Sequence, residues 1–214
     1  MIKFIQDLIS VNGFSRPGRP IVDVKAVIIH NIGMAGQTAK QVRDYWAGLA
    51  SQDAMDAKPD VSASAHFIVD LDGSVLVAVP ETEKAYHIGS SLPDPESGKI
   101  YTDLARQIFG EYAEDPDTNS PNRVALGIEM CQLDDQGTIS DVVLNSAAEL
   151  CADLCKAYDL DPLTRILTHH MVVGWKPCPL WMTNHPEDLT VFRFRVSDLM
   201  HHITDDEVAD AKNQ

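Results

Sequence analysis

The sequence has few basic residues and lacks a long apolar stretch. Each of these two absences argues against a class of protein. Its 214 residues include 17 Lys and Arg against 32 Asp and Glu, which gives a formal net charge of −15. Nucleic-acid-binding proteins concentrate basic residues against the phosphate backbone, whereas the basic residues here are scattered. No apolar run approaches the roughly 20 residues that a membrane-spanning helix needs. We therefore expect neither a nucleic-acid partner nor a membrane span.

Cysteine is also scarce, with four residues and no C-x₂-C pair. So few cysteines argue against a disulfide scaffold, and the missing pair argues against a closed structural zinc site. Cys151 and Cys155 stand four positions apart in a predicted helix, where we expect buried free thiols. The N-terminus lacks the uninterrupted apolar core and the cleavage site of a signal peptide, so we expect a protein that is cytoplasmic when synthesised.

The patterns that are present indicate one α/β domain. Apolar runs predict strands over residues 26–29, 66–69, 75–79, 124–130 and 165–167, with a hairpin at Asp72-Gly73 and a short arm before the first strand. Thr38 and Ser140 are expected to cap helices over about 39–49 and 141–158, and a short helix is expected near 102–109. This alternation predicts a single mixed sheet flanked by helices, α/β or α+β in some schemes. We expect one domain over 1–214, with its core over about 7–196 and an acidic tail at 204–214.

The most informative segment runs from Thr168 to Pro179. It places the pair His169-His170 and Cys178 on one short stretch, with a lysine two residues before the thiol. Far upstream, the strand predicted at 26–29 delivers His30 at its end. Two imidazoles and one thiolate form a plausible three-ligand zinc set, and catalytic zinc sites leave the fourth position to water. Considered alone, a histidine such as His30 is more often a structural or surface residue.

Five motifs follow one another along the chain: Val27-Ile28-Ile29-His30, Ser64-Ala65-His66-Phe67, Ala85-Tyr86-His87-Ile88-Gly89, Gly127-Ile128-Glu129-Met130, and Thr168-His169 with Lys176-Pro177-Cys178-Pro179. With them the chain resembles, over about residues 7–196, the zinc-dependent N-acetylmuramoyl-L-alanine amidases. That family includes prophage lysins and is related to the peptidoglycan recognition proteins. The resemblance implies their fold, a Zn²⁺ cofactor, and hydrolysis of the amide between N-acetylmuramic acid and L-alanine in peptidoglycan.

The resemblance also implies roles for single residues. The matching zinc ligands are His30, His169 and Cys178. Glu129 matches the catalytic carboxylate and Lys176 the lysine that stabilises the oxyanion. Some relatives have a tyrosine where this chain has Ala65, so the proton transfers that a phenol would assist fall to Glu129 here. Without the resemblance, Glu129 in an apolar strand would be equally consistent with an edge charge or a buried ion pair.

Two spacing arguments conflict over which histidine of the pair binds zinc. Some relatives place this ligand eight residues before the cysteine, which points to His170. The order threonine, ligand, x-x-Val-x-Gly points instead to His169 and needs one extra loop residue, most simply Trp175. Adjacent residues of a strand face opposite sides of the sheet, so only one of the pair is expected to reach the metal. Because a loop absorbs an insertion easily, we predict His169.

Candidates for contacts with the glycan or its stem peptide are His87, His66, Tyr86 and Trp175, although such residues near motifs often serve only packing. A non-catalytic peptidoglycan-binding module on the same fold is an alternative function, and an amidase for another acylated amino acid is a more remote one. Binding-only relatives typically lose the thiolate, and this chain retains Cys178, which favours the enzyme. We further expect a monomer that acts on the cell wall after release or export by an unidentified route.

Overall fold

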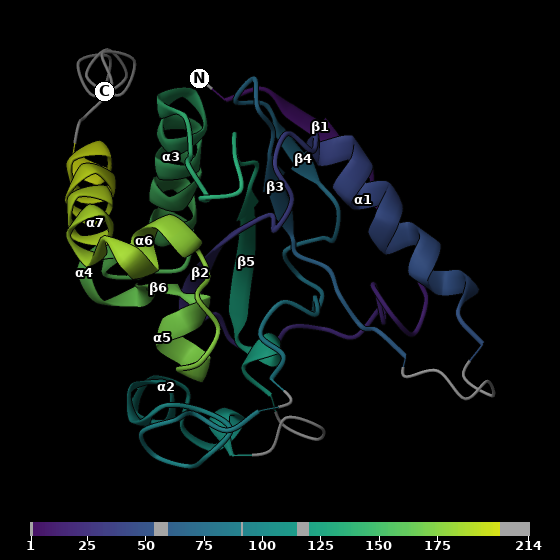
Figure 1. The fold of residues 1–214 in the computed structure, drawn as a ribbon, viewed down its shortest axis with the longest axis horizontal. Helices are drawn as coiled ribbons and strands as arrows, with labels where there is room; N and C mark the ends of the chain where they lie inside the picture. The colour runs from purple at the N-terminus through teal and green to yellow at the C-terminus, as the bar shows by residue number, and fades with distance from the viewer. Residues whose placement is uncertain (1, 54–59, 91, 115–119, 202–214) are drawn as a thin grey trace, which may run out of the picture.

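The computed structural model describes residues 2–53, 60–90, 92–114 and 120–201, and the predicted tail at 204–214 lies outside them. Its centre is one six-stranded sheet (Figure 1). In spatial order the strands are β1 (Phe4–Gln6), β4 (Val75–Val77), β3 (Phe67–Val69), β5 (Ala125–Met130), β2 (Ala26–Asn31) and β6 (Ile166–Thr168). The β3 and β4 strands are antiparallel and the other neighbours run parallel. The predicted mixed sheet is confirmed.

The helices begin and end close to the predicted residues wherever a helix was predicted. The α-helices of the described chain are α1 (Ala39–Gly48), α2 (Asp103–Phe109), α3 (Asp141–Ala157), α4 (Pro162–Arg165), α5 (His169–Val173), α6 (Leu180–Asn184) and α7 (Pro186–His201). Short 3₁₀ turns lie at Leu49–Ser51, Gly110–Ala113 and Pro121–Arg123. Thr38 and Ser140 cap α1 and α3 as predicted, because each side-chain oxygen accepts a hydrogen bond from a first-turn amide.

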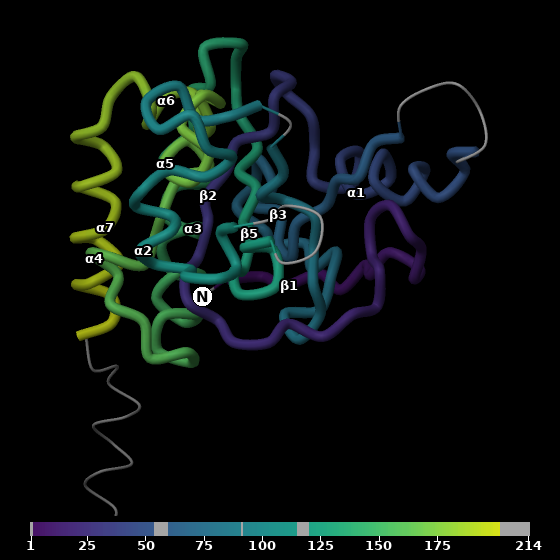
Figure 2. The backbone as a smooth tube through the Cα atoms, turned by 90° about the horizontal axis from the view of Figure 1, so that it is seen from below, coloured from purple at the N-terminus to yellow at the C-terminus, as the bar shows by residue number. Residues whose placement is uncertain are grey.

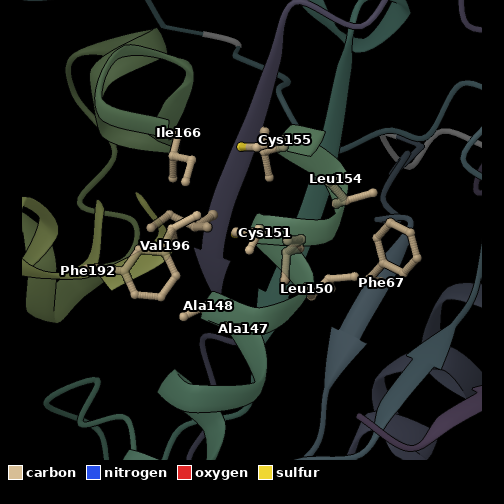
Figure 3. Packing of buried hydrophobic residues seen from close by; sticks show 14 of the residues in the cluster. Phe67, Ala147, Ala148, Leu150, Cys151, Leu154, Cys155, Ile166, Phe192 and Val196 are labelled. Atoms are coloured by element: carbon tan, nitrogen blue, oxygen red, sulfur yellow. The ribbon is translucent and has the colours of Figure 1, made fainter. Parts of the chain in front are cut away.

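One face of the sheet is covered by α3 and α7, which pack a large cluster of buried apolar side chains against it (Figure 3). The strands contribute alternate residues such as Leu126 and Ile128, since side chains one position apart point to opposite faces. Helix α3 contributes its predicted inner face, which includes Val143, Ala147, Leu150 and Leu154. Cys151 and Cys155 are buried free thiols in the same cluster, as predicted.

The opposite face is covered by other helices and carries two separate apolar clusters. Helix α1 packs Val42 and Trp46 over β3 and β4, far from α7 across the molecule (Figure 2). Helices α2 and α5 form the second cluster over β2 and β6, where Phe109 and Val172 pack near Ile28. Several histidines are buried on this same face. The sheet therefore has one mainly hydrophobic side and one side that mixes apolar and polar groups.

Besides the short helices α4, α5 and α6, the edge strand β1 and the long helix α7 were not predicted. Residues 4–6, expected to belong to an arm outside the core, form β1 at the edge of the sheet, beside β4. Helix α7 extends beyond the predicted core limit at 196. It packs Leu189, Phe192 and Val196 against α3 while Val191 and Phe194 stay exposed on its outer side. These exposed apolar residues blur the amphipathic pattern by which a helix is recognised in a sequence.

Candidate metal centre

The strand pairings bring the predicted site residues together at one edge of the sheet. Strands β2, β5 and β6 are parallel, so their carboxyl ends lie side by side. His30 is directly opposite Glu129 in the β2–β5 register. Ile29 pairs with Thr168 at the end of β6. His30 directly follows Ile29, and His169 directly follows Thr168, so the two histidines leave neighbouring strands at the same level. Crevices at the carboxyl ends of parallel strands are the usual place for ligand sites in such sheets.

His30, His169 and Cys178 form a compact cluster of donor atoms. One ligand atom from each lies within 4.8 Å of the others, and all three residues are buried. His30 Nδ1 is 3.6 Å from Cys178 Sγ, and the rings of His30 and His169 are 4.9 Å apart at an angle of 79°. By normal hydrogen-bond geometry neither ring nitrogen of His169 has a partner among the described residues, although the Gly89 backbone lies close enough to raise its pKa. Buried polar atoms are normally paired, so these orphaned nitrogens fit a bound metal ion.

Burial keeps all three donors neutral in the protein alone. Burial lowers the pKa of His169 to about 3, with Lys176 acting in the same direction. It also lowers the pKa of His30 well below its usual 6.5, aided by the neighbouring His169 and His87. Burial raises the pKa of the Cys178 thiol to about 12. A metal ion deprotonates a coordinating thiol outright, so two neutral imidazoles and one thiol fit a soft divalent cation such as zinc.

The loop that carries Cys178 is fixed by backbone hydrogen bonds. The His170 amide donates to the Cys178 carbonyl at 3.0 Å, and the Leu180 amide donates to the Asn31 side chain at 2.8 Å. The backbone amide of Asn31 also hydrogen-bonds the Cys178 thiol and favours its ionised form, which lowers its pKa. Asn31 was missed in the sequence; its only signal there is its place directly after His30.

The structure separates the two adjacent histidines, although for a different reason from the one predicted. The expectation that the pair lies on a strand is wrong, because β6 ends at Thr168 and both residues belong to the first turn of α5. Residues one apart on a helix differ in direction by about 100°. His169 turns inward to the cluster, whereas His170 Nδ1 lies 3.2 Å from the Lys176 carbonyl.

Glu129 and Lys176 face the same cleft as the metal-binding candidates, a cavity of about 640 Å³. Glu129 Oε2 is shielded from solvent and has no hydrogen-bond partner within the described chain. Burial raises the pKa of Glu129 to about 7, and the Lys176 ammonium opposes this shift. A carboxyl group that titrates near neutrality can both accept and donate a proton at working pH.

The four predicted substrate contacts have different surroundings. Tyr86 and His87 line the cleft. His66 does not reach it: its Nε2 donates to the Glu83 carbonyl at 2.8 Å, its Nδ1 accepts from the Gly127 amide at 2.9 Å, and the side chain is fully buried. Trp175 is not among the lining residues either, since it packs beside the α2 and α5 cluster and donates to Ser90 Oγ at 2.7 Å. We therefore assign His66 a structural role, whereas a contact between Trp175 and the substrate stays a prediction.

A mixed sheet that presents two histidines, a cysteine, a buried carboxylate and a lysine in one cleft defines a candidate metallohydrolase domain. Comparison with known sequences places it more closely. Residues 18–181 match the family N-acetylmuramoyl-L-alanine amidase, and the chain belongs to this family.

Individual relatives agree with that placement. The chain is 32% identical over 200 residues to a probable N-acetylmuramoyl-L-alanine amidase of Bacillus licheniformis, and 30% identical over 204 residues to the amidase CwlL of the same species. These alignments cover 94% and 95% of this chain, which spans about half the length of either relative (49%).

Solved structures share the fold. The catalytic domain of PlyG aligns with a TM-score of 0.64 at 17% identity, over 95% of this chain and 98% of that one. A mutant endolysin from Bacillus subtilis aligns with a TM-score of 0.61 at 22% identity, over 90% of this chain and 99% of that one. No helix in the described residues is both long and apolar enough to cross a membrane.

Proposed function

We propose that this chain hydrolyses the amide bond between N-acetylmuramic acid and the L-alanine of the stem peptide in peptidoglycan, with zinc held by His30, His169 and Cys178. One observation carries the proposal: the three donors converge within 4.8 Å beside Glu129 in a single cleft, in a member of the amidase family. Convergence of a full ligand set is what a binding-only module would lack, so it favours catalysis over the non-catalytic alternative.

Amide hydrolysis needs an activated water, a stabilised oxyanion and a proton for the leaving nitrogen. A zinc ion at the three ligands would lower the pKa of a water molecule to roughly 7 and polarise the scissile carbonyl. Glu129 is suited to take a proton from the attacking water and to deliver it to the nitrogen, since burial holds its pKa near 7. Lys176 places a cation at the cleft, where it can stabilise the oxygen that becomes negative.

The remaining proposals concern the substrate and its location. Tyr86 lines the cleft, which supports a role for this aromatic ring as a wall for glycan or peptide. The substrate lies in the cell wall, which the protein would reach after release or export. We propose that it acts as a monomer, because the predicted ligand set is complete within one chain.

Digestion of purified peptidoglycan tests this function directly. We expect zinc-loaded protein to release free L-alanine amino groups without creating new reducing sugar ends. New reducing ends would instead identify a glycosidase and contradict the amidase. Binding to peptidoglycan with neither product, by a protein with full zinc occupancy, would support the non-catalytic module.

A further inference from the structure

A second histidine, outside the candidate ligand set, contacts His30 directly. His87 Nδ1 is 3.1 Å from His30 Nε2, and both side chains are buried. The two rings meet edge to face, with centres 5.3 Å apart at an angle of 86°. The contact uses the nitrogen of His30 that points away from the cluster, because Nδ1 is the atom that faces Cys178. His87 therefore lies behind the metal-binding candidate.

The direction of the hydrogen bonds follows from a carbonyl group. His87 Nε2 is 3.2 Å from the carbonyl oxygen of Ala125, which can only accept a hydrogen bond. His87 Nε2 must therefore carry the hydrogen, and in a neutral ring its Nδ1 is then an acceptor. His30 Nε2 must in turn be the donor to that acceptor. This leaves the lone pair of His30 on Nδ1, directed at the cluster.

Two further contacts hold His87 in this position, one to its backbone and one to its ring. The Asn122 side chain accepts hydrogen bonds from the amides of His87 and Ile88, at 3.0 and 2.9 Å. The ring lies directly over Gly127 of β5, where an added Cβ atom would stand 2.6 Å from His87 Cγ and 2.7 Å from Nδ1. Real Cβ contacts essentially never come this close, so any other residue at position 127 would displace the ring.

We propose that His87 is a positioning residue that orients His30 and fixes it as a metal ligand through Nδ1, with Gly127 providing the space for its ring. The proposal rests on the metal site of the proposed function and replaces the expected role of His87 as a substrate contact. Groups that hold the second nitrogen of a ligating histidine fix its tautomer and ring orientation, and their loss typically costs roughly 10–100-fold in metal affinity.

The test compares zinc affinity in folded variants, measured by competition with a chelator. His87→Ala removes the acceptor, and Gly127→Ala displaces the ring without changing its chemistry; we expect both to weaken zinc binding by roughly 10–100-fold. His87→Asn returns an acceptor oxygen near the position of Nδ1 and should recover part of that loss. His185→Ala, at a half-exposed surface histidine, is the control and should bind zinc like the wild type.

Nitrogen-15 NMR of the histidine rings supplies a second readout that needs only the wild-type protein. With zinc bound, His30 should carry its proton on Nε2 and coordinate through Nδ1. Coordination of His30 through Nε2, or unchanged zinc affinity in folded His87→Ala, would overturn the role of His87 alone. A wild-type protein that binds no stoichiometric zinc would overturn the metal site as well.

Discussion

The two faces of the sheet use the same strands for opposite purposes. In β5, Leu126 and Ile128 enter the apolar cluster under α3 and α7, whereas Glu129 lines the cleft and Gly127 lies beneath the His87 ring on the same side. On the face covered by α3 and α7, apolar contacts stabilise the fold by excluding water. On the cleft side buried histidines and a carboxylate are held in positions that cost stability in the absence of a ligand. The alternation of a single strand thus separates groups that stabilise the fold from groups that act on a ligand.

Removal of a cleft residue should abolish function while the protein retains its stability. We expect His169→Ala to abolish stoichiometric zinc binding and all amidase activity, because one of three ligands is lost. The metal-free protein should stay folded, since both nitrogens of His169 lack partners in the described structure. Metal content of the purified variant, together with thermal unfolding, measures both effects.

His170→Ala is the matched control for that variant. It should retain zinc with at most a partial loss of rate, since His170 Nδ1 lies by the Lys176 carbonyl and outside the cluster. A zinc-replete His169→Ala protein beside a zinc-free His170→Ala protein would show that the other histidine is the ligand.

Within the cleft, Glu129→Gln separates metal binding from proton transfer. The amide keeps the shape of the side chain but cannot accept the proton of the attacking water. We expect kcat to fall by about a hundredfold or more with full zinc occupancy. Steady-state kinetics and metal analysis of the same sample are the measurements. Near-normal kcat in a zinc-replete variant would remove Glu129 from the mechanism.

On the face covered by α3 and α7, two neighbouring valines of α3 allow a matched pair of variants. Val143 is fully buried against the sheet, and Val142 is half exposed. Val143→Ala should lower the free energy of unfolding by about 2 kcal/mol, from the lost apolar contacts and the cavity left behind. Val142→Ala should change it by less than about 0.5 kcal/mol. Urea denaturation measures the difference. Zinc affinity should be equal in both variants; a loss confined to Val143→Ala would mean that the two faces are coupled.

His66, a structural histidine on the cleft side, should contribute a modest pH dependence to the stability of the fold. Burial lowers its pKa from 6.5 to about 4, so the folded protein keeps the ring neutral where the unfolded chain binds a proton. Its stabilising contribution is complete above about pH 6.5 and is lost as the pH falls toward 4. Between pH 7 and 5.5, wild-type stability should fall by about 1 kcal/mol more than that of His66→Gln. Equal slopes in the two proteins would contradict the neutral buried ring.

The sequence predicted those parts of the fold that depend on local patterns. The runs around Ile28 and Ile128 predicted β2 and β5, and capping residues such as Ser140 fixed the start of α3 to one residue. Features that depend on distant contacts were not accessible. The bond between Asn31 and the Leu180 amide joins residues 149 positions apart. The position of His170 also depends on the residue at which β6 ends and α5 begins. The apolar residues in this part of the sequence did not predict that boundary.

The folded unit is longer than the segment that carries the catalytic motifs, because it also includes helix α7. The family match ends at residue 181, after every candidate ligand and before α7 begins. Yet α7 supplies Phe192 and Val196 to the wall against which α3 packs, and Arg193 donates two hydrogen bonds to the Ile166 carbonyl on edge strand β6. A module cut at the last motif would keep its chemistry and lose part of its core. Fusion of this domain to a targeting module therefore requires a junction that leaves α7 intact through His201.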